Sequence, residues 1–108
     1  MADTSRIDTL KEFLKDDPND SFVIFALAKE YEKQNLKKLA LDTFLYLKDK
    51  DTNYIGLYYH LGKLYEELGE TDNALLTYEN GVDIAKKAAD FHALSELHNA
   101  KMNLEIEI

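Results

Sequence analysis

Two apolar stripes with helical spacing flank Gly69 and predict a pair of packed helices. The first stripe runs at i, i+3, i+4 and i+7 and contains Tyr58, Leu61, Gly62 and Tyr65. The second runs at i, i+4 and i+7 and contains Ala74, Tyr78 and Gly81. Gly69 can adopt the positive φ that ends a helix, and Thr71 or Asp72 can cap the next one. The small residues of both stripes are predicted to lie where the helices approach most closely.

The same pattern occurs 34 residues earlier in the chain. Its members keep the chemical class of each position and are Ile24, Leu27, Ala28, Tyr31, Ala40 and Phe44. Asn35 replaces Gly69, and asparagine also tolerates a left-handed turn. A 34-residue period with aromatic-x2-Leu-Gly-x2-Tyr followed by Ala-x3-aromatic resembles the tetratricopeptide repeat family. The resemblance implies an all-α fold of about six helices, a right-handed superhelix of helical hairpins.

The resemblance divides residues 1–108 into repeats of a single domain. Residues 21–53 and 54–87 are two full repeats, and residues 5–17 form a half-repeat helix that Pro18 ends. The inward face of that first helix is predicted to contain Ile7, Leu10, Phe13 and Leu14. Residues 88–104 are predicted to be a partial repeat or capping helix. Its stripe, at a spacing of 33, contains Phe91, Leu94, Ser95 and His98, and the last five residues are expected to be extended or frayed.

The side of each first helix that is not used for packing predicts a binding surface, because first helices line the concave side of such repeats. Aromatic rings and lysines recur there at helical spacing. The predicted contact residues are Phe22, Phe25, Lys29, Tyr59, His60, Lys63, His92 and Glu96. Aromatic area with lysine charges suits a peptide with apolar anchors and an acidic group. The alternative is that the lysines pair with Glu32 and Glu66 and remain solvated.

Charge and composition restrict the partners further. The net charge is −8, from 13 basic and 21 acidic residues, and Arg6 is the only arginine. This balance opposes binding to nucleic acid or to an anionic membrane, since both need clustered cations. The N-terminus lacks the basic and apolar regions of a signal peptide, and no apolar run is long enough to span a bilayer. A cytoplasmic location is expected.

No motif for catalysis, metal or cofactor binding is found in the sequence. The three histidines have no HExxH spacing, and there is no cysteine. The stretch from Asp49 to Asn53 begins like a calcium loop, but Tyr54 stands where glycine is required. The four glycines do not form a phosphate-binding pattern. We therefore expect no cofactor, no metal and no enzymatic activity.

These observations predict a non-catalytic adaptor or scaffold that binds another protein or a peptide. One alternative is a structural subunit that self-associates through the apolar faces of its incomplete end repeats, giving a homo-oligomer. Another is a chaperone dedicated to one client. The family also contains proteins that clamp a C-terminal carboxylate with groove lysines and asparagines. The corresponding positions in this chain are Phe25, Lys29, His60, Ala89 and Ala93. Only Lys29 among them is basic and none is an asparagine, so this binding mode is not expected.

Overall fold

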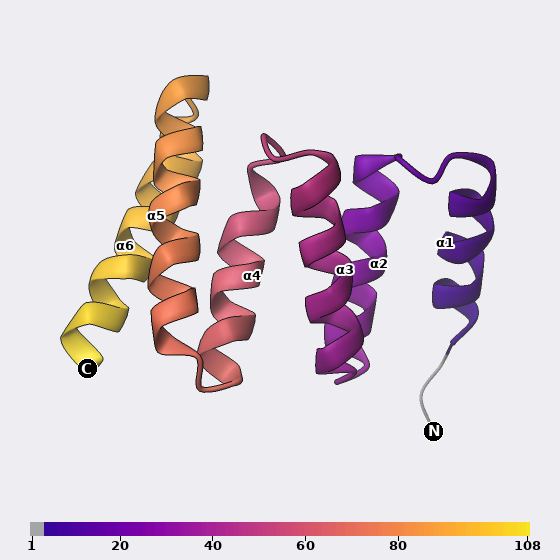
Figure 1. Cartoon of the computed structure of the whole chain (residues 1–108), viewed down its shortest axis with the longest axis horizontal. Coiled ribbons are helices and arrows are strands. Elements are labelled where there is room, and N and C mark those ends of the chain that lie inside the picture. Colours follow the sequence, from indigo (N-terminus) through magenta and orange to yellow (C-terminus); the bar gives the residue numbers. More distant parts are fainter. Residues whose placement is uncertain (1–3) are drawn as a thin grey trace. The chain divides into compact units, whose positions relative to one another are not determined.

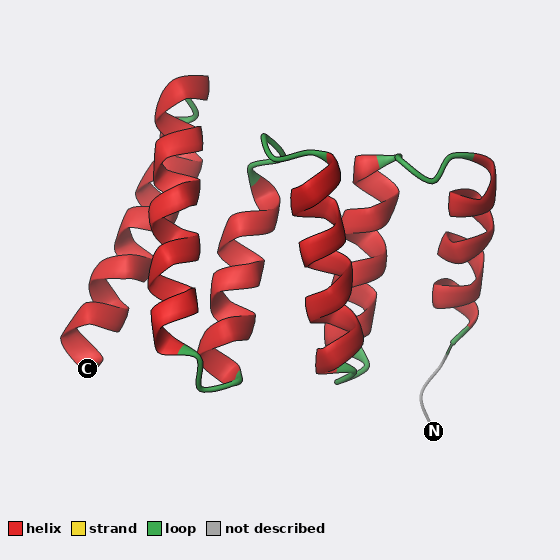
Figure 2. Cartoon of the chain, viewed as in Figure 1, coloured by secondary structure: helices red, strands yellow, loops and turns green. Residues whose placement is uncertain are grey.

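The computed structural model describes residues 4–108, all of them in helices or in the short turns between helices (Figures 1 and 2). The helices are α1 (Ser5–Asp16), α2 (Ser21–Lys33), α3 (Lys37–Lys50), α4 (Gly56–Glu67), α5 (Thr71–Ala88) and α6 (Phe91–Glu107). The prediction of an all-α fold of six helices is confirmed for this range. Residues 1–3, part of the segment considered for a signal peptide, lie outside it. The chain forms two compact units, which divide between Tyr54 and Ile55.

The first unit contains α1, α2 and α3, with the hairpin of α2 and α3 at its centre. Its core is made of apolar residues from all three helices: Ile7, Leu10, Ile24, Leu27, Ala28, Tyr31, Ala40, Phe44 and Leu47. The side chain of Asp20 accepts a hydrogen bond from the Val23 N–H at 3.1 Å and caps α2. Asn35 has φ 60° in the turn before α3, which confirms the predicted left-handed position.

The second unit contains α4, α5 and α6, and two glycines allow close contacts between its helices. A Cβ on Gly62 would lie 2.2 Å from Cε1 of Tyr78, and one on Gly81 would lie 2.7 Å from Cβ of Tyr58. The predicted close approach at small residues is therefore confirmed. Gly69 has φ 76°, as its place between the helices predicted.

Two local predictions are wrong. The N-cap of α5 is Glu70, whose side chain makes no capping hydrogen bond, and Thr71 is already helical. Phe13 is 56% exposed, so the buried face of α1 is narrower than predicted and contains Ile7 and Leu10. Within residues 4–108, no helix covers the side of α1 that contains Phe13.

The stripe predicted for α6 is also wrong. Phe91 is 72% exposed, and Ser95 and His98 are exposed as well, whereas the buried residues are Leu97, Ala100 and Leu104. α5 has 18 residues where α3 has 14, but the turn after α5 is shorter, so α4 and α6 each begin 35 residues after the start of the preceding first helix. The buried residues Leu61 of α4 and Leu97 of α6 are 36 residues apart, so the predicted spacing of 33 selected a different face of α6. The final residues continue α6 as far as Glu107 and are not extended.

Candidate functional site

The packing stripe and the stripe beside it differ in burial as the sequence predicted. Ile24 and Tyr58 are 1% and 0% exposed, while the next residues, Phe25 and Tyr59, are only partly buried. The ring of Phe25 packs against those of Phe44 and Tyr54, with centroids 6.2 and 5.2 Å away. Part of the Phe25 ring therefore supports the hairpin, and the rest of it remains at the surface.

A lysine lies over an aromatic ring at the same place in both full repeats. The Nζ of Lys29 is 5.3 Å from the ring centroid of Phe25, and that of Lys63 is 5.7 Å from the centroid of Tyr59. Each pair is formed at i, i+4, which brings the two side chains onto one helical face. A cation at this distance from a ring face is attracted by the ring quadrupole. The ammonium groups are thus held next to aromatic surface.

Lys63 also lies near a carboxylate, as the alternative of paired lysines predicted. Its Nζ is 3.8 Å from Oε2 of Glu66, and the same oxygen accepts a hydrogen bond from the hydroxyl of Tyr78. Burial, the hydrogen bond to Glu66 and nearby charges raise the pKa of Tyr78 well above its usual value, so the phenol stays protonated and donates. Glu66 is shared between the buried phenol and the surface lysine, which remains half exposed.

The other predicted contact residues lie in different surroundings. His60 is half-buried and meets the ring of Tyr59 edge-on, with centroids 5.8 Å apart. His92 and Glu96 are exposed on α6. They were chosen with the wrong spacing, because Tyr59 and Lys63 correspond to Ser95 and Asn99 when the spacing is 36. The pairing of ring and lysine is therefore not continued on α6, and binding by His92 and Glu96 stays a prediction.

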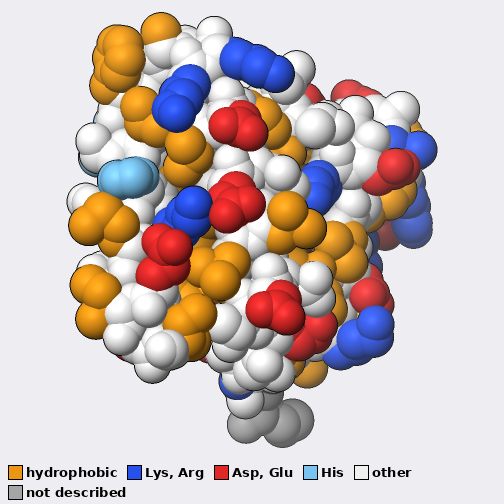
Figure 3. All heavy atoms as spheres, turned by 60° about the vertical axis from the view of Figure 1, so that its left-hand side comes forward, with side chains coloured by type: hydrophobic (Ala, Val, Ile, Leu, Met, Phe, Trp, Pro, Cys, Tyr) orange, Lys and Arg blue, Asp and Glu red, His pale blue; other side chains and the backbone are white. Residues whose placement is uncertain are grey.

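The most exposed apolar residues of α6 lie at its two ends. They are Phe91, Ile106 and Ile108, at 72%, 79% and 69%. In Figure 3 apolar side chains alternate with acidic and basic ones across the visible face. Such scattered apolar residues are normal for protein surfaces.

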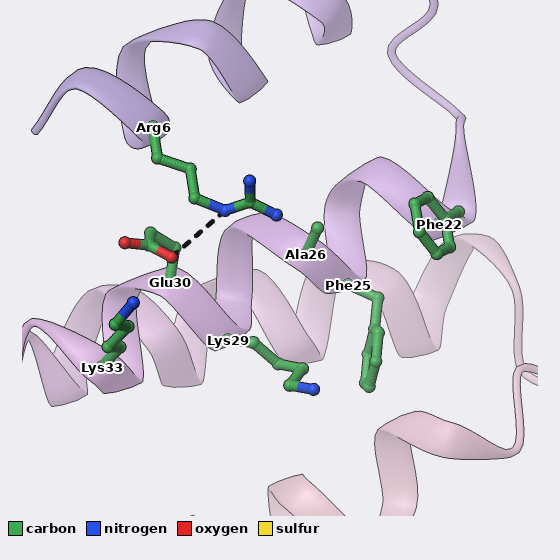
Figure 4. Close-up of a pocket in the computed structure, with 7 residues that line it drawn as sticks. All are labelled: Arg6, Phe22, Phe25, Ala26, Lys29, Glu30 and Lys33. Carbon is green, nitrogen blue, oxygen red and sulfur yellow. Dashed lines mark ion pairs between the residues drawn. The ribbon is translucent and has the colours of Figure 1, made fainter.

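A pocket of about 580 Å³ lies between α1 and α2, and we call it the α1–α2 pocket (Figure 4). It is lined by Arg6, Phe22, Phe25, Ala26, Lys29, Glu30 and Lys33. Three of these residues were predicted as contacts, and the sequence analysis missed the others. One signal was present: Arg6 occupies the position that Ala40 and Ala74 hold in the full repeats.

An ion pair at the base of this pocket joins the two helices. The Nε of Arg6 is 3.4 Å from Oε2 of Glu30, and the amide of Gln34 donates to Oε1 of Glu30 at 3.3 Å. The side chain of Glu30 is 9% exposed, whereas that of Arg6 is 64% exposed. Both carboxylate oxygens of Glu30 therefore have partners. The guanidinium of Arg6 is paired with this buried carboxylate, while most of the Arg6 side chain is exposed to solvent.

The described part of the chain offers no cluster for metal chemistry. Within residues 4–108 there is no group of three or more histidines, aspartates and glutamates that could hold an ion. None of the six helices has both the length and the apolar composition needed to cross a membrane.

No known family model matches the chain, and no curated protein matches it either. Solved structures do. The chain is similar to the solution structure of a tetratricopeptide repeat domain protein from Salinibacter ruber, with 45% identity and a TM-score of 0.79 over 82% of this chain and 90% of that one. For a crystal structure of a tetratricopeptide repeat domain protein from the same organism, the identity is 44%, the TM-score 0.77, and the coverage 80% and 97%.

More distant structures share the fold alone. PcrH, solved in complex with the chaperone binding region of PopD, has 16% identity and a TM-score of 0.86 over 94% of this chain and 77% of that one. The Yersinia enterocolitica type III secretion translocator chaperone SycD has 13% identity and a TM-score of 0.85 over 94% and 70%. The repeat pattern, the helical hairpins and the 45% identity to the Salinibacter protein lead to one conclusion: the chain belongs to the tetratricopeptide repeat family.

Proposed function

We propose that this protein is a non-catalytic protein-binding module, which takes up a peptide or a partner protein on the first helices of its repeats. One observation carries the proposal: α2 and α4 both present a lysine over a partly exposed aromatic ring, on the side that packing does not use. The hairpin core takes its fully buried residues from the neighbouring stripe, and only part of the Phe25 ring packs against it. The aromatic surface would supply contact area, and the lysines would orient an acidic group.

The mechanism relies on side chains that are held in place before a partner arrives. Phe25 is fixed by Phe44 and Tyr54, and Lys29 rests over Phe25. Binding then orders few side chains on the protein side, which lowers its entropic cost. The structural neighbours support a protein partner by analogy, because PcrH was solved with a segment of PopD and SycD is described as a chaperone. A chaperone for one client would be a narrower form of the same function.

Self-association through the end helices is not favoured by the structure. In the second unit α4 approaches α5 closely because Gly62, Ala74 and Gly81 are small. If α6 of one copy packed in this way on α1 of another, large side chains would occupy the positions of these small residues. His98 would stand in the place of Gly62, and Arg6 and Phe13 in the places of Ala74 and Gly81. A hairpin-like contact between copies would therefore be held apart by these side chains.

The test is affinity capture with mass spectrometry, using the wild type and a Lys29→Glu, Lys63→Glu variant. Both lysines are at the surface, so the variant should keep the helical circular dichroism of the wild type and lose the bound partner. Lys38→Glu is the matched control, because the Lys38 side chain is 80% exposed on α3. If the partners of the double variant and of the wild type are the same, the proposal is wrong.

A further inference from the structure

The α1–α2 pocket has a charge opposite to that of the chain as a whole. Its lining contains three basic side chains and one acidic side chain, whereas the chain has a net charge of −8. The single acid, Glu30, already has both oxygens engaged. We propose that this pocket binds an acidic, extended segment of a partner protein, with a side-chain carboxylate on Arg6. This rests on the proposed function and names the chemistry of the partner.

The geometry of Arg6 favours a carboxylate. Glu30 holds the guanidinium through Nε, and the two terminal nitrogens lie on the side away from Glu30 (Figure 4). A planar guanidinium binds a carboxylate end-on with two parallel N–H···O bonds, and these are stronger than bonds between neutral groups. Because Glu30 is buried and also bonded by Gln34, it acts as a positioning residue for Arg6. The ion pair therefore favours an orientation in which the terminal nitrogens face away from Glu30.

The positions of the two lysines on α2 indicate how further acidic residues would be spaced in the bound segment. Lys29 and Lys33 are four residues apart, which is about 6 Å along a helix axis. In an extended peptide, side chains two residues apart point the same way and are about 6.6 Å apart. Acidic residues at alternate positions of a bound segment would therefore match both lysines. This favours an Asp/Glu-x-Asp/Glu pattern.

An apolar side chain is expected at the other end of the segment. Phe22 is 70% exposed at the start of α2, while Lys33 is the last residue of the helix. Phe22 and Ala26 lie one turn apart and offer apolar surface on the same helix as the lysines. The pocket thus has an apolar end and a basic end, and a matching segment carries an apolar residue next to its acids.

This chemistry is not a requirement of the repeat. At the positions of Arg6 and Glu30, the following repeat has Ala40 and Leu64. Leu64 is fully buried, as the packing of such a position normally requires. An arginine and a buried glutamate therefore replace apolar residues only at the α1–α2 pocket. Burying a carboxylate costs free energy unless it is paired, and here the pair directs a guanidinium outward.

The experiment is a selection of random short peptides displayed on phage, with the whole 108-residue protein as target. We expect the selected peptides to contain alternating Asp or Glu residues beside an aliphatic or aromatic residue. Synthetic copies should bind about tenfold or more weakly to Arg6→Gln and to Lys33→Gln, since each variant loses a charge-assisted contact. Added salt should weaken binding to the wild type. Lys38→Gln is the control for a loss of positive charge elsewhere.

Arg6→Lys separates the proposed fork from simple charge attraction. It keeps the positive charge but cannot bind a carboxylate with two parallel bonds, so it should bind nearly as weakly as Arg6→Gln. Wild-type affinity in Arg6→Gln and Lys33→Gln, selected peptides without acidic residues, or no selected peptide would overturn the inference. Peptides or partners that depend on Lys63 and not on Arg6 would overturn it and leave the proposed function intact. Circular dichroism of each variant verifies folding.

Discussion

Replacing Gly62 with alanine tests the close approach of α4 and α5. In a helix that faces solvent, this change stabilises by about 1 kcal/mol, because alanine has the higher helix propensity. At Gly62 the new Cβ would lie 2.2 Å from Cε1 of Tyr78 and 2.7 Å from its Cδ1 and Cζ. Carbon atoms pack at about 3.5–4.0 Å, so the ring and the helix must separate by roughly 1 Å or more.

The ring of Tyr78 cannot move aside at low cost. It is fully buried, and its hydroxyl donates to Glu66. Overpacking a core costs about 1–3 kcal/mol, and this contact belongs at the upper end of that range. After the gain in propensity is subtracted, we expect Gly62→Ala to lower the free energy of unfolding by about 2 kcal/mol. For a domain of this size that is a decrease in Tm of roughly 10 °C.

The assay is thermal and urea unfolding followed by circular dichroism at the helical band. Gly56→Ala is the control, because Gly56 is exposed at the start of the same helix and should be neutral or stabilising. Adding Tyr78→Leu to Gly62→Ala should destabilise by less than the sum of the two single changes, since the smaller side chain relieves the clash. A Tm for Gly62→Ala equal to or above that of the wild type would refute the reasoning.

Three further predictions concern the helix ends and the buried phenol. Ala89 has φ 55° and is exposed, so Ala89→Gly should stabilise by about 1 kcal/mol in urea unfolding, and a destabilised variant would contradict the left-handed turn. Asp20→Ala removes the acceptor for the Val23 N–H and should cost about 1 kcal/mol, whereas Asp20→Asn should retain most of the stability. Burial first, and then the hydrogen bond to Glu66, raise the pKa of Tyr78 above its ordinary 10.0, so folding favours the protonated phenol. The contribution of this phenol to the free energy of unfolding is complete below pH 10 and is lost as the pH rises above 10. The urea midpoint of the wild type should therefore fall above pH 10, and that of Tyr78→Phe should fall less.

Much of the fold could be predicted because its signals are local. The 3.6-residue period identified the buried stripes at Ile24 and Tyr58, and these are buried. Asn35 and Gly69 indicated the turns within the hairpins, and both have positive φ. The 34-residue period then identified the family, since a repeated stripe and turn imply a repeated hairpin. Each of these inferences needs only neighbouring residues along the chain.

The surroundings of the proposed binding surface were predicted less completely, because they depend on residues from different helices. Arg6 and Glu30 are far apart in the sequence, and only the packing of α1 on α2 brings them into one pocket. The lysines of both repeats were placed on the stripe beside the packing stripe and lie at the surface, but the sequence could not show that they rest over Phe25 and Tyr59.

The sequence by itself determined where the helices lie and which faces of α2 and α4 are buried, because periodicity and turn residues act within one element. The tertiary structure decided the face that α6 buries and the surroundings of Arg6. The second repeat was predicted to end at residue 87, and α5 ends at Ala88, but the left-handed turn at Ala89 had no glycine or asparagine to indicate it. Packing of α6 against α5 and α4 sets which residues of α6 are buried: Leu97, Ala100 and Leu104.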